Sequence, residues 1–304
     1  MRSTISLLAL GIVAWLAAPA AQELFRSGIE TVFLSVSVSD TSRLPVRGLT
    51  REDFRVTEDG LLQDITVFAS DAQPVALSML IDSSISMERK MAIAQQAAIG
   101  FARRLGPKDV AQVMSFDTDV EIRQSFTSDV ALLERAIRAI QPRGATSLYT
   151  ALYVALSELR RVRSVDQSEI RRQVIVVLSD GEDTNSVLPF DEVLDATKRS
   201  NVAVYSIRMR EGPPRARASS DRFESALQSL SLATGGRTYP VNDVNQLPAI
   251  YEQIAIELAN QYIIGYTSKN PRRDGMWRRV SVQAARPNTT ARTRSGYFAP
   301  RSMQ

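Results

Sequence analysis

Cysteine and histidine are both missing from this chain of 304 residues. Without cysteine the chain has no disulfide framework, thiol nucleophile or thiolate metal site. Without histidine, a Ser-His-Asp triad and the usual zinc sites are excluded. A metal ion bound by this chain must therefore have oxygen ligands, which favours a hard cation such as Mg²⁺, Mn²⁺ or Ca²⁺.

A strong excess of one charge is also missing. The chain has 37 basic and 33 acidic residues, a net charge of +4, and its arginines occur in short, scattered clusters without interleaved aromatic residues. Such clusters are typical of solvated surface. We therefore expect no nucleic-acid partner.

The one segment that resembles a targeting sequence lies at the amino terminus. Arg2 precedes an apolar run from Ile5 to Ala18, and Ala18-Pro19-Ala20 offers small residues at the two cleavage positions. This pattern predicts a secretory signal peptide over residues 1–20. An uncleaved anchor is the alternative, but the run is shorter than the roughly 20 residues that a spanning helix needs. We therefore expect an exported protein, periplasmic or secreted, without a stable membrane span after cleavage.

The N-terminal region after the signal, residues 21–73, has the pattern of antiparallel strands. Apolar side chains recur at every second position from Val32 to Val38, a period of two that puts one face on a core. Phe54 and Val56 lead into Asp59-Gly60, a hairpin turn signal, after which the alternation resumes.

Between residues 74 and 260 the pattern changes to alternating strands and helices. Strands buried on both faces are predicted by the continuous apolar runs Val75–Ile81, Val110–Met114, Val174–Leu178 and Val202–Ile207. Apolar stripes at helical spacing separate or follow these runs, at residues 91–105, 132–140, 148–159, 190–198, 223–230 and 247–258. The alternation predicts an α/β fold with a doubly wound, mostly parallel sheet.

Residues 261–304 return to a β pattern. Three strands are predicted, at Tyr262–Tyr266, Trp277–Val282 and Thr293–Phe298. Each terminal set of strands is small, and the two ends of an α/β domain usually lie close together. We therefore expect both sets to form one small β-sandwich, with the α/β domain inserted between its halves.

Oxygen-bearing side chains follow the predicted buried strands. Asp82, Ser84 and Ser86 come at the end of the first strand, and Asp180 follows a later one. Thr146 begins a helix after the loop Gly144-Ala145. Because binding sites in open α/β sheets form at the carboxyl ends of the strands, these two carboxylates and three hydroxyls predict a site for a hard cation.

At these residues the sequence resembles the von Willebrand factor A family, which includes integrin inserted domains. Asp82-Ser83-Ser84-Ile85-Ser86 matches the family's Asp-x-Ser-x-Ser motif of the metal-ion-dependent adhesion site (MIDAS), and Thr146 and Asp180 match its later Thr and Asp. The resemblance implies that Ser84, Ser86 and Thr146 offer hydroxyls to a divalent ion. It also implies that Asp82 and Asp180 hold the ion directly or through water, and that a Glu or Asp of a protein partner completes the shell.

The flanks extend the resemblance to nearly the whole mature chain. "PVRGLTREDFRVTEDG" before the domain, and "YIIGYTSKNPRRDGMWRRVSVQAARP" with "RSGYFAP" after it, are similar to the flanks of exported acidobacterial proteins that carry this domain. That subgroup implies a fold and a metal site but no particular task. One departure is Ala145, where many members have a second glycine.

Simpler interpretations exist for several of these residues. Asp82, Ser84 and Ser86 are also suitable caps for a helix that begins near Met87. Asp117 and Asp119 are interpreted as turn residues. Tyr149 and Asp183 are candidates for the rim of the ligand site, with core packing and a solvated loop as their respective alternatives.

The sequence thus predicts a non-enzymatic protein that binds a partner through a divalent ion, Mg²⁺ being favoured over Mn²⁺ and Ca²⁺. One alternative is a structural envelope scaffold whose metal site is vestigial. The other is a Mg²⁺-dependent phosphoryl-transfer enzyme, although the chain has no G-x-x-x-x-G-K-[ST] loop and its general bases are limited to carboxylates and lysine.

Overall fold

A computed structural model of the chain describes residues 31–71, 73–162, 171–209 and 217–301. The predicted signal peptide therefore lies outside the described residues. Within the described ranges no helix is both long and apolar enough to cross a membrane.

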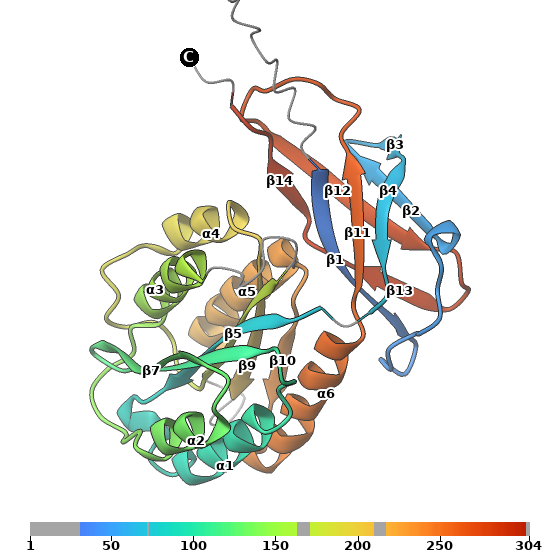
Figure 1. Cartoon of the computed structure of the whole chain (residues 1–304). Coiled ribbons are helices and arrows are strands. Elements are labelled where there is room, and N and C mark those ends of the chain that lie inside the picture. The colour runs from blue at the N-terminus through green and yellow to red at the C-terminus, as the bar shows by residue number, and fades with distance from the viewer. Residues whose placement is uncertain (1–30, 72, 163–170, 210–216, 302–304) are drawn as a thin grey trace, which may run out of the picture. The chain divides into compact units, whose positions relative to one another are not determined.

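The central sheet has six strands in the order β10-β9-β8-β5-β6-β7 (Figure 1). Its strands are β5 (Val75–Asp82), β6 (Val110–Phe116), β7 (Val120–Thr127), β8 (Arg172–Ser179), β9 (Val202–Met209) and β10 (Thr238–Val241). All neighbours pair in parallel except β7, which runs antiparallel to β6 at the edge. The structure therefore confirms the doubly wound, mostly parallel sheet, and adds two strands, β7 and β10, that the apolar runs did not indicate.

Helices cover both faces of this sheet (Figure 1). They are α1 (Met91–Ala102), α2 (Val130–Arg138), α3 (Leu148–Arg161), α4 (Phe190–Lys198), α5 (Arg217–Thr234) and α6 (Leu247–Ala259). Successive residues of β5 point to opposite faces, so Leu77 and Met79 pack with α1, α2 and α6 in one core, whereas Ala76 and Leu80 pack with α3, α4 and α5 in the other. Strands buried on both sides explain the continuous apolar runs.

The chain's two ends form two further four-stranded antiparallel sheets, ordered β13-β1-β11-β4 and β14-β12-β2-β3. Their strands are β1 (Thr31–Asp40), β2 (Phe54–Glu58), β3 (Leu61–Gln63), β4 (Ile65–Ala69), β11 (Tyr262–Thr267), β12 (Trp277–Ala284), β13 (Thr289–Arg292) and β14 (Gly296–Phe298). Each sheet combines strands from both ends of the chain, and apolar side chains from both sheets share one core. The predicted sandwich is thus confirmed.

The prediction of one strand over Thr293–Phe298 is wrong. Residues 293–295 lie in no strand, and only Gly296–Phe298 forms a strand, β14, which pairs with β12. A separate strand, β13, precedes the segment and pairs with β1 in the other sheet. Between them, the Ser295 amide donates to the carbonyl of Ala233 at 3.1 Å, outside either ladder. The change of sheet depends on pairing with distant strands, so the local sequence pattern does not reveal it.

A carboxylate whose side chain is only 12% exposed connects the sandwich to the α/β domain. Glu257 of α6 accepts hydrogen bonds from Ser37 Oγ of β1 at 3.0 Å and from the Tyr205 hydroxyl of β9 at 2.5 Å. Arg292 of β13 forms an ion pair with the same carboxylate. The four groups come from both layers, so they fix α6 at the point where the chain returns to the sandwich.

Candidate metal centre

Strand β5 ends in Asp82, whose side chain is fully buried. One carboxylate oxygen accepts a hydrogen bond from Ser179 Oγ of the neighbouring strand β8 at 2.6 Å, and the other accepts from the Ser84 amide at 2.8 Å. Burial raises the pKa of Asp82 to about 6, against the opposing effect of these hydrogen bonds. Asp82 is therefore held rigidly at the carboxyl end of the sheet, beside the strand pair where the connections change direction.

Three of the predicted site residues form a continuous chain of oxygen contacts. Ser84 Oγ lies 3.0 Å from Ser86 Oγ, and Ser86 Oγ donates to Oδ1 of Asp180 at 2.7 Å. Ser84 and the Asp180 side chain are buried. The strand end after β5 and the strand end after β8 thus place a carboxylate and two hydroxyls together, as predicted.

Thr146 joins this group from the loop before α3. A Cβ atom built on Gly181 lies 3.6 Å from Thr146 Oγ1 and 4.0 Å from Ser86 Oγ, so both hydroxyls lie against the same glycine. Two backbone bonds hold the loop to the strand end after β5: the Arg143 amide donates to the Ser83 carbonyl at 2.7 Å, and the Ile85 amide donates to the Gly144 carbonyl at 3.2 Å. All five predicted ligands therefore lie in one region.

Ala145 does not disturb this loop. The residue that needs a positive φ is Gly144, at +66°, and a Cβ there would lie 2.4 Å from Thr118 Oγ1. Ala145 is not among the residues with positive φ, and its amide donates to Thr118 Oγ1 at 3.1 Å. The departure from two glycines is therefore tolerated where it occurs.

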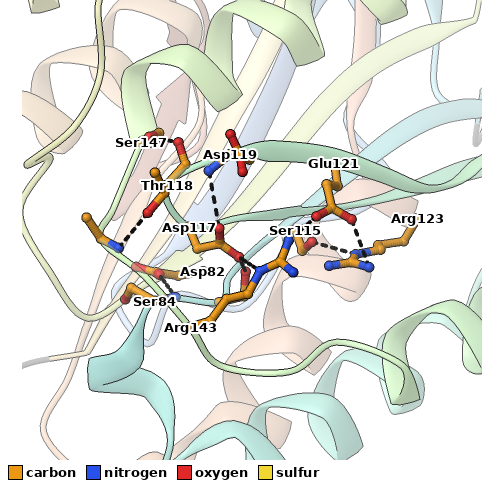
Figure 2. Close-up of polar contacts among 12 residues, drawn as sticks. Asp82, Ser84, Ser115, Asp117, Thr118, Asp119, Glu121, Arg123, Arg143 and Ser147 are labelled. Carbon is orange, nitrogen blue, oxygen red and sulfur yellow. Dashed lines mark hydrogen bonds and ion pairs between the residues drawn. The ribbon is translucent and has the colours of Figure 1, made fainter.

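Asp117 has a larger role than a turn residue. Its buried carboxylate accepts from Ser83 Oγ at 3.0 Å and from Arg143 Nε at 3.2 Å, and Arg143 also pairs with Glu121 (Figure 2). These bonds fasten the loop that carries Thr146 to the strand end that carries Asp82. No local pattern indicates this brace, because Ser83, Asp117 and Arg143 come from three separate segments of the chain.

A lysine lies in the centre as well, and sequence reasoning missed it. Lys90 Nζ forms an ion pair with Oδ2 of Asp180, and its side chain is only 13% exposed. Lys90 follows the motif by only four residues, and the short 3-10 helix and turn between them bring its side chain back to the site. The centre thus contains two carboxylates and one ammonium group.

The donor set fits a small hard cation. Oxygen ligands at about 2.1 Å from Mg²⁺ and at right angles to one another lie roughly 3 Å apart. The contacts between Ser84 Oγ and Ser86 Oγ, at 3.0 Å, and between Ser86 Oγ and Asp180 Oδ1, at 2.7 Å, are close to that edge length. Across the described ranges no three Asp or Glu side chains gather as a metal-binding group, so a cation here depends on the hydroxyls.

The capping interpretation of this motif does not hold. The segment after Ser84 is a short 3-10 helix, Ile85–Met87, and the Ser84 side chain makes no capping hydrogen bond to it. The long helix α1 begins only at Met91, with Lys90 at the cap position. The serine hydroxyls are therefore directed to one another and to Asp180 instead of to helix amides.

The two proposed rim residues have packing roles in the structure. Asp183 Oδ1 accepts from the Tyr149 amide at 3.2 Å and from Ser186 Oγ at 2.6 Å, which caps the first turn of α3. The Tyr149 ring packs on Phe190 with 5.6 Å between centroids. Burial raises the pKa of the Tyr149 hydroxyl, and the negative charges of Asp183 and Glu182 raise it further.

Comparison with known proteins agrees with this architecture. Residues 77–182 match the family model for the von Willebrand factor type A domain. The chain thus contains a von Willebrand factor type A (VWA) domain, and the matched span includes Asp82, Thr146 and Asp180. No curated protein matches the chain.

Solved structures of low sequence identity share the fold. Von Willebrand factor type A from Catenulispora acidiphila matches with a TM-score of 0.52 and 12% identity, over 89% of this chain and 74% of that chain. Proximal thread matrix protein 1 from the mussel byssus matches with a TM-score of 0.51 and 15% identity, over 74% of this chain and 50% of its own. The same mussel protein "with zinc occupied MIDAS motif" matches with a TM-score of 0.50 and 16% identity, over 66% and 49%. This chain therefore spans about half the length of the mussel protein.

Proposed function

We propose that this chain is an exported protein whose VWA domain binds a divalent ion, preferably Mg²⁺. Through this ion the domain binds an acidic side chain of a partner protein. The observation that carries the proposal is the run of oxygen contacts Ser84–Ser86–Asp180, spaced close to the ligand edge of a Mg²⁺ site. The mussel protein with a zinc-occupied MIDAS supports it as a likeness of fold.

The division of charge in the centre explains why a carboxylate is the expected partner group. Ser84, Ser86 and Thr146 offer neutral hydroxyls, while Asp82 is bonded to Ser179 and the Ser84 amide. When bound, a divalent ion held largely by neutral ligands keeps an uncompensated positive charge that attracts an incoming carboxylate. Ser86 is exposed, so the partner's carboxylate has access to the ion from that side.

Peptide display tests this function directly. A random peptide library is selected on the immobilised protein in Mg²⁺, and the recovered peptides are measured in Mg²⁺ and in EDTA. We expect peptides with a required Asp or Glu, whose binding is lost in EDTA, in Thr146→Val, and when the acidic residue is replaced by its amide. Binding that persists in EDTA would contradict the proposed mechanism.

A structural scaffold with a vestigial metal site is the second candidate, and the ion pair between Lys90 and Asp180 favours it. It predicts no saturable metal binding by the wild-type protein. A phosphoryl-transfer enzyme is the third candidate, and it predicts Mg²⁺-dependent turnover of a phosphoester that is lost in Asp82→Asn. We propose that the chain is not an enzyme.

A further inference from the structure

A cavity of about 270 Å³ lies at the opposite end of the central sheet from the candidate metal centre. It is formed where the first residues of β8 and β9 meet β1, β11 and the crossing between β13 and β14. Among the described residues that line it, four are basic and none is acidic; the basic ones are Arg171, Arg172, Lys198 and Arg294.

Arg294 lines this cavity, and its guanidinium group donates hydrogen bonds to neutral acceptors. Its Nη1 donates to Oδ1 of Asn201 and its Nη2 donates to the Phe33 carbonyl at 3.1 Å, both neutral acceptors. Its Nε is buried and has no hydrogen-bond partner. Within the described ranges no carboxylate pairs with Arg294, and burial lowers the pKa of its guanidinium group.

Arg172 also lines the cavity and forms no ion pair with a carboxylate of the described residues. The residue is 7% exposed, and its Nη atoms donate to Gln261 Oε1 and to the backbone carbonyls of Leu258 and Gln73, at 2.6–2.7 Å. Its Nε is buried without a partner. Asp109 acts on Arg172 only at a distance, since its two oxygens accept from the Val75 and Gly106 amides.

A third unpartnered donor lines the same cavity. The Thr293 hydroxyl is buried and makes no hydrogen bond. An unpaired buried charge and an unmade buried hydrogen bond are both unfavourable, because the groups lose their hydration without gaining a partner. Two guanidinium groups that form no ion pair within the described ranges, and an unpartnered hydroxyl, thus belong to residues that line one cavity. They indicate a missing negative group with several acceptor atoms.

We propose that this cavity is a binding site for a small oxyanion of the phosphate type. A tetrahedral oxyanion presents acceptors in several directions, so it can meet donors that come from different strands, and its charge offsets both guanidinium groups. The cavity volume exceeds that of one water, about 30 Å³, several-fold, which leaves room for the anion and its remaining waters. Arg172 belongs to the VWA domain and Arg294 to the C-terminal strands, so the bound anion stabilises their junction.

Thermal unfolding in EDTA, with inorganic phosphate against chloride at equal ionic strength, tests the site apart from the metal centre. The variants are Thr293→Val and Arg294→Met, and Arg55→Met is the matched control because Arg55 is exposed and does not line the cavity. Phosphate is expected to raise the Tm of the wild type and the control equally, since it binds only the folded state. Calorimetric titration with phosphate is expected to show affinity weakened about tenfold or more in Arg294→Met, with a smaller loss in Thr293→Val.

If Arg294→Met fails to fold, Thr293→Val still tests the anion site. The Thr293 hydroxyl has no hydrogen-bond partner in the anion-free protein, so its removal breaks no existing bond. The same phosphate-dependent rise in all four proteins would overturn the proposal. So would the absence of any rise in the wild type, which is the result expected if a carboxylate of the chain itself fills the site.

Discussion

The ammonium group of Lys90 contacts the carboxylate of Asp180 at the tip of β8, inside the group of oxygens that fits a divalent ion. The same carboxylate accepts a hydrogen bond from Ser86 Oγ. Lys90 therefore neutralises one of the two negative charges of the centre, and a metal ion must compete with it for Asp180.

Replacing this lysine is expected to strengthen metal binding. Lys90→Met removes the competing cation and leaves both carboxylates, so the Mn²⁺ affinity measured by calorimetry should rise about tenfold or more, which corresponds to roughly 1.4 kcal/mol or more. Arg89→Met is the matched control, because it removes an exposed positive charge one residue earlier. Equal affinities for Lys90→Met and the wild type would show that Lys90 does not compete.

The raised pKa of Asp82 predicts how the metal-free protein responds to pH. Its pKa in the folded protein, about 6, lies above the ordinary value of 3.8, so folding favours the protonated carboxyl. The stabilisation is present in full below about pH 4 and is lost as pH rises through 6, a change of roughly 3 kcal/mol from this group. Urea unfolding in EDTA should show that Asp82→Asn, which cannot ionise, lacks this dependence. If the two proteins have parallel pH profiles, Asp82 does not titrate in this range.

The loop that carries Thr146 depends on one glycine. Gly144→Ala is expected to destabilise the fold by about 1–3 kcal/mol, because its φ is +66° and the added Cβ meets Thr118 Oγ1. It should also weaken metal binding, since the loop must move. Ala145→Gly, one residue later, is expected to change stability by less than about 1 kcal/mol and to keep metal affinity. Two variants with the same loss would show that the loop geometry is wrong.

The junction between the sandwich and α6 depends on Glu257. Glu257→Ala leaves Arg292 and the Tyr205 hydroxyl without their shared acceptor, so we expect a loss of about 3–5 kcal/mol in the free energy of unfolding. Glu252 of the same helix makes an exposed ion pair with Arg104, and Glu252→Ala should cost about 1 kcal/mol or less. Similar losses in the two variants would argue against a buried network.

Most of the fold could be predicted from the sequence because local patterns carry it. Strands buried on both faces, such as β5, give continuous apolar runs, and Asp59-Gly60 forms the expected hairpin with positive φ at both residues. The edge strand β7 is half-exposed and lacks such a run. The last part of the chain forms two strands, β13 and β14, which pair with two different sheets, and no local pattern shows this.

In the candidate site, too, the residues that belong to a local motif could be predicted, and those that depend on long-range contacts could not. The strand-end motif indicates Asp82, Ser84, Ser86 and Asp180 directly, and a helix start indicates Thr146. Asp117 and Arg143 act through contacts between separate loops, and the three unpartnered donors at the second cavity, on Arg172, Thr293 and Arg294, come together only in the folded chain. Contacts between distant segments therefore account for what the sequence did not predict.

Calorimetric titration of the wild-type protein and of Asp82→Asn with Mn²⁺ tests the central claim most directly. The account predicts saturable binding of one ion to the wild type, and affinity lower by at least about a hundredfold when the Asp82 charge is removed. Absence of binding to the wild type, or equal binding by both proteins, would contradict a metal centre built on Asp82.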